Sequence, residues 1–146
     1  LAENKLKQAE QSLNQATGYL KGHEQSLSAA RVYSNQAELL HKQKKNQHAL
    51  AMYQKTIDTY SAQTNLKEED LFAQASVLNN WGLLHYQNSQ MQEAEKLFLK
   101  AYDSIQLYAD DRALPILDNL VAFYTANAKQ EQVNTFAKIA KKIRQQ

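Results

Sequence analysis

The stretch at residues 78–102, which reads LNNWGLLHYQNSQMQEAEKLFLKAY, decides the fold of this chain. Two apolar runs with helical spacing flank a polar break at residues 87–90, and this pattern predicts two helices joined by a tight turn. Gly82 and Ala94 lie twelve positions apart, one on each predicted helix. We expect them at the helix crossing, because a side chain larger than a methyl group there would push the helices apart.

The same spacing recurs on both sides of this stretch. Ala37 and Ala49 are separated by the same distance along the chain, and so are Val121 and Val133. Near the start of the chain, Ala9, Leu13 and Ala16 repeat the pattern of a second helix that has no first helix before it. The equivalent second-helix positions recur at nearly equal intervals: Ala9, Ala49, Ala94 and Val133. This recurrence predicts a helical repeat protein.

The expected fold is therefore an all-α solenoid of about seven helices in a single domain at residues 1–146. A lone helix is predicted at residues 2–20, followed by helix pairs at 23–60, 67–108 and 111–145. The individual helices are expected at 2–20, 23–44, 47–60, 67–88, 90–108, 111–126 and 127–144. The chain begins with Leu1 rather than Met, and we expect it to be part of a longer chain.

Polar residues at the breaks predict how these helices begin. Serine or asparagine followed three residues later by Glu or Gln is a capping signature. It occurs in three pairs: Ser89 with Gln92, Asn65 with Glu68, and Asn127 with Gln130. Asp110 or Asp111 should cap the sixth helix, with Pro115 in its first turn, where no backbone N–H is needed.

Composition excludes several classes of site. The absence of cysteine excludes disulfides, thiol catalysis and thiolate metal sites, but leaves the cellular compartment open. The only glycines are Gly18, Gly22 and Gly82, so no glycine-rich phosphate loop exists. The four histidines do not have metal-ligand spacing, and the acidic runs at residues 68–70 and 110–111 are expected to complement helix dipoles. We therefore expect no cofactor, no metal and no enzyme activity.

The repeat pattern resembles that of tetratricopeptide repeats. The shared signature is a small residue, Ala twelve positions later, an aromatic residue four further on, and Ala or Thr three after that. The best match is Gly82, Ala94, Phe98 and Ala101, followed by Ala37, Ala49, Tyr53 and Thr56. The third set fits loosely: Val121, Val133, Ala137 and Ala140. The period near 40 and the string LNNWG at residues 78–82 resemble the longer repeats of the kinesin light chain type.

This resemblance implies a right-handed superhelix whose first helices line a concave peptide-binding groove. Asn35, Asn80 and Asn119 each lie two residues before the small residue of their repeat. Such a ladder of amides can bond both the N–H and the C=O of an extended peptide, although solvent-facing amides would give the same pattern. The neighbouring groove candidates are Glu38, Asn79, Leu83 and Tyr86. Most other aromatic residues are expected in the core.

Some tetratricopeptide domains clamp a C-terminal carboxylate with basic groups and asparagines. Ser34 and Pro115 occupy the positions where lysines would be expected here, and Glu38 and Asn119 replace an asparagine and an arginine. These departures argue against such a clamp. The basic residues of the last helix, between Lys138 and Arg144, are expected to form the polar face of a terminal capping helix rather than a nucleic-acid surface.

The predicted function is a protein–protein interaction module that binds a peptide or protein segment in the concave groove. Two alternatives remain open: a structural or oligomerisation segment, and a sensory domain that binds a signal peptide within a larger regulatory protein. The lone first helix also suggests self-association, because either upstream repeats or a second copy of the chain would cover it. No apolar stretch approaches the ~18 residues of a membrane span.

Overall fold

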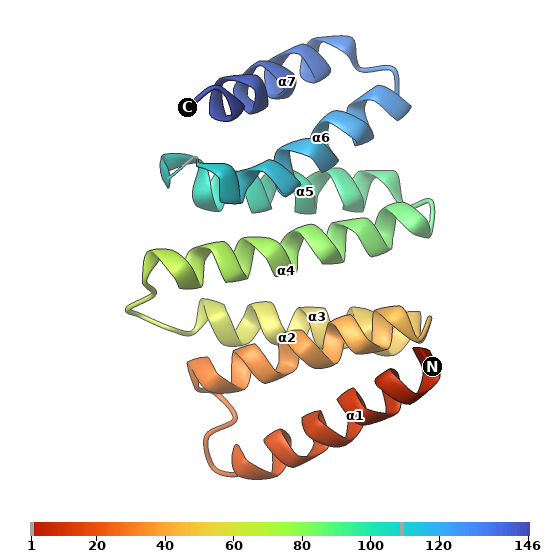
Figure 1. Ribbon diagram of the computed structural model, residues 1–146, viewed down its shortest axis with the longest axis vertical. Coiled ribbons are helices and arrows are strands. Elements are labelled where there is room, and N and C mark those ends of the chain that lie inside the picture. The colour runs from red at the N-terminus through yellow and green to blue at the C-terminus, as the bar shows by residue number, and fades with distance from the viewer. Residues whose placement is uncertain (1, 109) are drawn as a thin grey trace. The chain divides into compact units, whose positions relative to one another are not determined.

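The computed structural model describes residues 2–108 and 110–146, and the chain within them is helical (Figure 1). Seven α-helices and two short 3₁₀ helices follow one another in this part. Their bounds are α1 Ala2–Tyr19, α2 Leu27–Lys42, α3 Asn46–Ser61, α4 Glu68–Gln87, α5 Met91–Ile105, η1 Gln106–Tyr108, η2 Asp111–Ala113, α6 Leu114–Ala126 and α7 Gln130–Arg144. The predicted all-α repeat fold is confirmed. No helix in the described part is long and apolar enough to cross a membrane.

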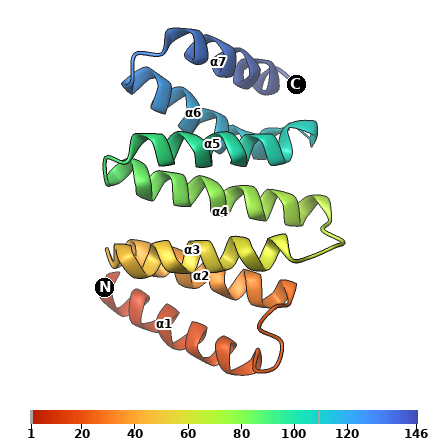
Figure 2. The ribbon, with the colours of Figure 1, turned by 180° about the vertical axis from the view of Figure 1, so that it is seen from behind.

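The chain divides into two compact units. Unit 1 ends at Asn65 and contains α1, α2 and α3, whereas unit 2 begins at Leu66 and contains α4 to α7. Within unit 1, α1 lies against α2, which pairs with α3; within unit 2, α4 pairs with α5 and α6 with α7 (Figures 1 and 2).

Each helix pair is joined by the same turn. Lys44, Ser89 and Ala128 are non-glycine residues with positive φ, at 60°, 60° and 56°. The N–H of the residue after each one donates to the carbonyl five positions earlier, at 2.9 Å in all three turns, which satisfies a carbonyl that the helix end would leave unpaired. Each turn residue lies five positions before Ala49, Ala94 or Val133, so the backbone repeats with the same register as the sequence.

The predicted caps at these turns are wrong. Ser89 occupies the left-handed position instead of capping α5, and Asn127 ends α6, where its Nδ2 donates to the carbonyl of Phe123 at 2.8 Å. The helices after the turns begin without a side-chain cap, because the turn itself sets their direction. At α4, Asn65 does not cap; the N-cap is Lys67, whose N–H donates to the Asp70 carboxylate at 3.1 Å.

Several helix boundaries also differ from the prediction, and α6 and α7 each begin three residues later than expected. α2 begins at Leu27 rather than residue 23, because the Ser26 side chain accepts the Ala29 N–H and starts the helix there. The helix predicted to reach residue 108 ends at Ile105 and continues as a 3₁₀ turn. Asp110 caps the next 3₁₀ turn by accepting the Arg112 N–H, and Pro115 lies in the first turn of α6, as expected.

The close helix crossing is most evident at Gly82. A Cβ atom built on Gly82 would lie 2.9 Å from both Cδ1 and Cε1 of Phe98 and 3.3 Å from Cβ of Leu97. Ala37, Ala49 and Ala94 are also fully buried. In the third pair the crossing residues, Val121 and Val133, are half-buried.

α1 packs differently from the other helices. None of its described residues is buried, and its only half-buried side chains are Leu6, Leu13 and Ala16. Ala9, which the repeat pattern placed at a helix crossing, is exposed. α1 therefore has the sequence pattern of the second helix of a pair, but its residues are not buried as those of α3 and α5 are.

Candidate functional site

A small cavity in unit 2 lies between α4, α5 and α6. Its volume is about 60 Å³, and its lining residues are Leu83, Tyr86, Phe98, Asn119, Ala122 and Phe123. Three of the predicted groove residues, Leu83, Tyr86 and Asn119, therefore meet at one place. All six lining residues are uncharged, so the cavity suits an apolar group accompanied by a hydrogen bond.

Aromatic rings form the floor of this cavity. Phe123 meets Tyr86 edge to face, with ring centroids 5.9 Å apart, and meets Phe98 in the same way at 5.8 Å. Phe98 and Phe123 are buried, whereas Tyr86 is half-buried. Edge-to-face packing fixes ring orientation, so the floor is preformed and Tyr86 is its accessible edge. The sequence predicted Phe98 and Phe123 only as core residues. The same apolar spacing is expected of a core ring whether or not it also lines a cavity, so the sequence could not indicate this second role.

An amide pair borders the cavity. The Asn119 Nδ2 group of α6 donates to Oδ1 of Asn79 in α4 at 3.0 Å. Asn79 is only 7% exposed, whereas Asn119 is half-buried, so the bond lies at the border between the interior and the cavity. A side-chain amide has two N–H donors and two acceptor lone pairs, and the bond to Asn79 uses one donor of Asn119. Asn80, which the repeat pattern placed beside Asn119, is engaged in an interaction of its own and is not in the cavity lining.

The two remaining predicted groove residues lie in unit 1. Asn35 and Glu38 line a wider groove of about 390 Å³ between α1 and α2. The other lining residues are Lys5, Leu6, Ala9, Ser12 and Leu13 of α1, with Leu39 and Lys42 of α2. The predicted groove residues are thus divided between two places, one in each unit.

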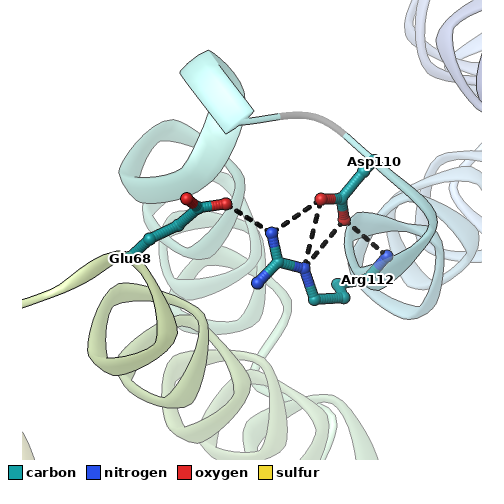
Figure 3. Close-up of polar contacts among 3 residues, drawn as sticks. All are labelled: Glu68, Asp110 and Arg112. Atoms are coloured by element: carbon teal, nitrogen blue, oxygen red, sulfur yellow. Dashed lines mark hydrogen bonds and ion pairs between the residues drawn. The ribbon is translucent and has the colours of Figure 1, made fainter.

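Two acidic residues of unit 2, Glu68 and Asp110, bind the side chain of Arg112 (Figure 3). The Arg112 guanidinium forms an ion pair with Glu68, at the start of α4, and donates to both Asp110 carboxylate oxygens, with Nε–O distances of 3.0 and 3.2 Å. It also lies 3.9 Å from the ring centroid of Phe72. These contacts link the η2 turn that precedes α6 to the start of α4.

This cluster shifts the protonation equilibria of its members. The side-chain and backbone hydrogen bonds from Arg112 lower the pKa of Asp110 below its usual range, because they stabilise the charged carboxylate. The same bonds to Asp110 and Glu68 raise the pKa of Arg112. The sequence predicted the acidic residues as complements of the helix dipoles, but it gave no sign that Arg112 and Glu68, far apart along the chain, form a pair.

The described part of the chain offers no arrangement typical of a metal site. Among residues 2–108 and 110–146, no three His, Cys, Asp or Glu side chains could hold a metal ion together. Two histidines contact neighbouring polar groups instead. His41 Nδ1 lies 3.0 Å from the hydroxyl of buried Tyr53, and His85 Nδ1 lies 2.6 Å from Oε1 of Gln90.

Comparison with known proteins identifies the fold but no family. No protein-family model matches the chain, and no curated protein matches it. The crystal structure of BtubC (BKLC) from P. vanneervenii is similar in fold, with a TM-score of 0.50 and 14% sequence identity. The similarity covers 98% of this chain and 73% of BtubC. A likeness at this identity supports a helical repeat fold and leaves the function to be argued from the residues.

Proposed function

We propose that this chain is a protein–protein interaction module of the tetratricopeptide type, and that unit 2 binds an extended peptide segment across α4 and α6. The observation that carries the proposal is the preformed aromatic cavity with an amide at its border. The cavity would receive an aliphatic side chain of the peptide, and the groups of Asn119 not used by Asn79 would bond its backbone. A non-catalytic role agrees with this site, since its lining has no acid, base or nucleophile in a paired arrangement.

The test requires a ligand and a way to block the cavity. Peptides selected from a random displayed library on the purified chain would be titrated by calorimetry against three proteins: wild type, Ala122→Trp and Ala126→Trp. Ala122 and Ala126 are both exposed on α6, but only Ala122 lines the cavity. We expect Ala122→Trp to weaken binding about tenfold or more and Ala126→Trp to leave it unchanged, since one buried anchor side chain contributes roughly 1.5–3 kcal/mol. Equal affinity for both variants would place the peptide elsewhere.

A structural or oligomerisation role is the second candidate, and the exposure of α1 favours it, because none of its described residues is buried. In that case the chain would self-associate through α1. Sedimentation velocity over a hundredfold range of protein concentration separates this role from peptide binding. A constant monomer mass disfavours the oligomerisation role, whereas a mass that rises with concentration, and that Leu6→Asp keeps constant, would support it.

The peptide selection also tests a sensory role. If the displayed library yields one peptide sequence in which no substitution is tolerated, a sensory domain with a dedicated signal peptide is favoured instead.

We also propose that both units belong to one repeat domain over residues 1–146. The connection between α3 and α4 at residues 62–67 is the point where the units meet in the chain. Protease nicking confined to this connection, with two separate unfolding transitions, would contradict a single domain.

A further inference from the structure

A second cavity of unit 1 lies between α1, α2 and α3, and its volume is about 150 Å³. Each of the three helices and the turn between α2 and α3 contributes to its lining. The lining residues are Glu10, Leu13 and Asn14 of α1, Gln36, Leu39 and Leu40 of α2, Gln43 and Lys45 of the turn, and Met52 of α3. An apolar cavity of this volume can hold one benzene ring. The cavity is therefore large enough for a single aromatic ring.

The repeat register relates this cavity to a part of unit 2 that aromatic side chains fill. Ala9 corresponds to Ala94, which relates α1 to α5. The turn residues Lys44 and Ala128, both with positive φ, relate α2 and α3 to α6 and α7. Four apolar lining residues of the cavity then have aromatic counterparts. The pairs are Leu13 with Phe98, Leu39 with Phe123, Leu40 with Tyr124, and Met52 with Phe136.

The four aromatic side chains of unit 2 pack on one another. Tyr124 stacks on Phe136, with ring centroids 5.8 Å apart and ring planes inclined by 3°. Phe123 meets Tyr124 edge to face at 5.3 Å and Phe98 in the same way at 5.8 Å. All four belong to α5, α6 and α7, and none to the preceding helix α4. The cavity of unit 1 therefore follows from the smaller side chains of α1, α2 and α3 themselves.

Glu10 keeps the chemistry of its counterpart in unit 2. It corresponds to Glu95, whose carboxylate accepts a hydrogen bond from the hydroxyl of Tyr124. Burial, the negative charge of Glu95 and this hydrogen bond raise the pKa of Tyr124 to about 12, so its hydroxyl stays protonated and donates. In unit 1 the carboxylate is present, whereas Leu40 stands in place of the tyrosine.

The lining is also more polar than its counterpart at two positions. Asn14 and Gln36 correspond to Leu99 and Leu120. Side-chain amides in a cavity favour a ligand that carries a hydrogen-bonding group over a plain hydrocarbon ring. Together with Glu10, they point to a ring that carries a hydroxyl.

We propose that the cavity between α1, α2 and α3 binds a phenol ring, which takes the place that the Tyr124 side chain has in unit 2. The ring would pack on the leucines and on Met52, since contacts between methionine sulfur and an aromatic ring are favourable. Its hydroxyl would donate to the carboxylate of Glu10. A free phenolic compound and a tyrosine side chain of a partner protein both present this chemistry. The site is separate from the peptide site proposed in unit 2 and does not depend on it.

The two methionines of the chain supply the signals for a test. Met52 lines the cavity, whereas Met91 lies at the start of α5. The full chain, labelled with carbon-13 at the methionine methyl groups, is titrated with para-cresol, the side-chain analogue of tyrosine. We expect a saturable shift of the Met52 methyl signal and none of the Met91 signal. No shift of Met52 at millimolar para-cresol, or equal shifts of both signals, would overturn the proposal.

Matched variants test the position of the ring and its hydrogen bond. Leu40→Tyr, checked for folding by circular dichroism, should fill the cavity and abolish the Met52 shift. Glu10→Met should lower the affinity for para-cresol relative to toluene, which lacks the hydroxyl, by about threefold or more. Glu3→Met should leave this ratio unchanged, because Glu3 is exposed on α1 but does not line the cavity. A folded Leu40→Tyr variant that still binds, or equal ratios in the two glutamate variants, would refute the assignment.

A blocked tyrosine distinguishes the two sources of the ring. N-acetyltyrosine amide carries the same phenol on a peptide backbone. If it shifts the Met52 signal with an affinity equal to that of para-cresol, the cavity accepts a tyrosine side chain of a partner protein. If its affinity is about tenfold lower or less, the ligand is a free phenolic compound.

Discussion

The substitution Gly82→Ala measures how tightly α4 and α5 are packed. Alanine in a helix interior is favoured over glycine by about 1 kcal/mol, so an uncrowded site would gain stability. At Gly82 the new Cβ would lie 2.9 Å from two Phe98 ring carbons. Phe98 is only 2% exposed and its ring packs edge to face on Phe123, so it cannot retreat without moving a second buried ring. Overpacking of this kind costs about 1–3 kcal/mol, and we expect a net destabilisation of roughly 1 kcal/mol.

Gly18→Ala is the matched control. Gly18 lies in α1, and a Cβ added there would meet nothing within 4 Å. The same substitution should therefore increase helix content and stability, by up to about 1 kcal/mol. We expect the two substitutions to differ in sign because Phe98 and Leu97 crowd Gly82, whereas nothing lies near Gly18.

Urea unfolding followed by circular dichroism and by fluorescence measures both effects. Trp81 is the only tryptophan in the chain and lies in α4, so its emission reports on unit 2. Adding Phe98→Leu should recover part of the Gly82→Ala loss, with a coupling free energy of roughly 1 kcal/mol or more in the double-mutant cycle. If Gly82→Ala stabilises the chain as much as Gly18→Ala does, and no coupling appears, the close crossing at Gly82 is refuted.

Three further predictions concern unit 2. Ser89→Gly should raise the free energy of unfolding by about 0.5–1 kcal/mol in urea titrations, because glycine adopts positive φ without strain; a loss would mean that the serine side chain matters to the turn. Because the pKa of Asp110 is lowered in the folded state, its contribution to stability is present above the usual carboxylate pKa and is lost as pH falls through the folded value. The melting temperature of Arg112→Met should therefore fall less steeply than that of wild type between about pH 5 and pH 2, and parallel curves would contradict the pairing. Phe123→Ala should lower the free energy of unfolding by roughly 3–5 kcal/mol, because Phe123 packs on both Tyr86 and Phe98. Arg144→Ala removes a half-exposed ion pair and should lower it by under about 1 kcal/mol. Thermal melts in which both variants lose the same stability would contradict a central role of Phe123 in the core.

The helix pairs could be predicted from the sequence because two closely crossing helices need small residues at the crossing, and these residues recur at a fixed spacing. Gly82 must be small to accept Phe98, and its fixed spacing from Ala94 sets both helices around the turn. The capping predictions failed at the same turns for a physical reason. Ser89 and Ala128 adopt a left-handed conformation that their residue types do not signal, and a backbone hydrogen bond to the carbonyl five positions earlier replaces the expected side-chain cap.

Contacts between distant segments were the harder part to predict. The amide that pairs with Asn119 is that of Asn79 rather than Asn80, and adjacent residues of a helix point about 100° apart. Only the relative rotation of α4 and α6 decides between them, and the repeat pattern does not contain that rotation. That these groove residues bind a peptide stays a prediction, which the Ala122→Trp titration tests.

The shared turn of the three helix pairs has a consequence for how such a chain can change in evolution. The spacing within a pair is the same in all three, whereas the spacing between successive second helices varies, and the longer loop and the 3₁₀ segments occur between pairs. An inserted residue within a pair would break the left-handed turn and rotate the second helix out of the crossing, whereas an insertion after Ser61 or Tyr108 would only lengthen a surface connection. We therefore expect homologous chains to differ in length between the pairs and to keep one fixed length inside them.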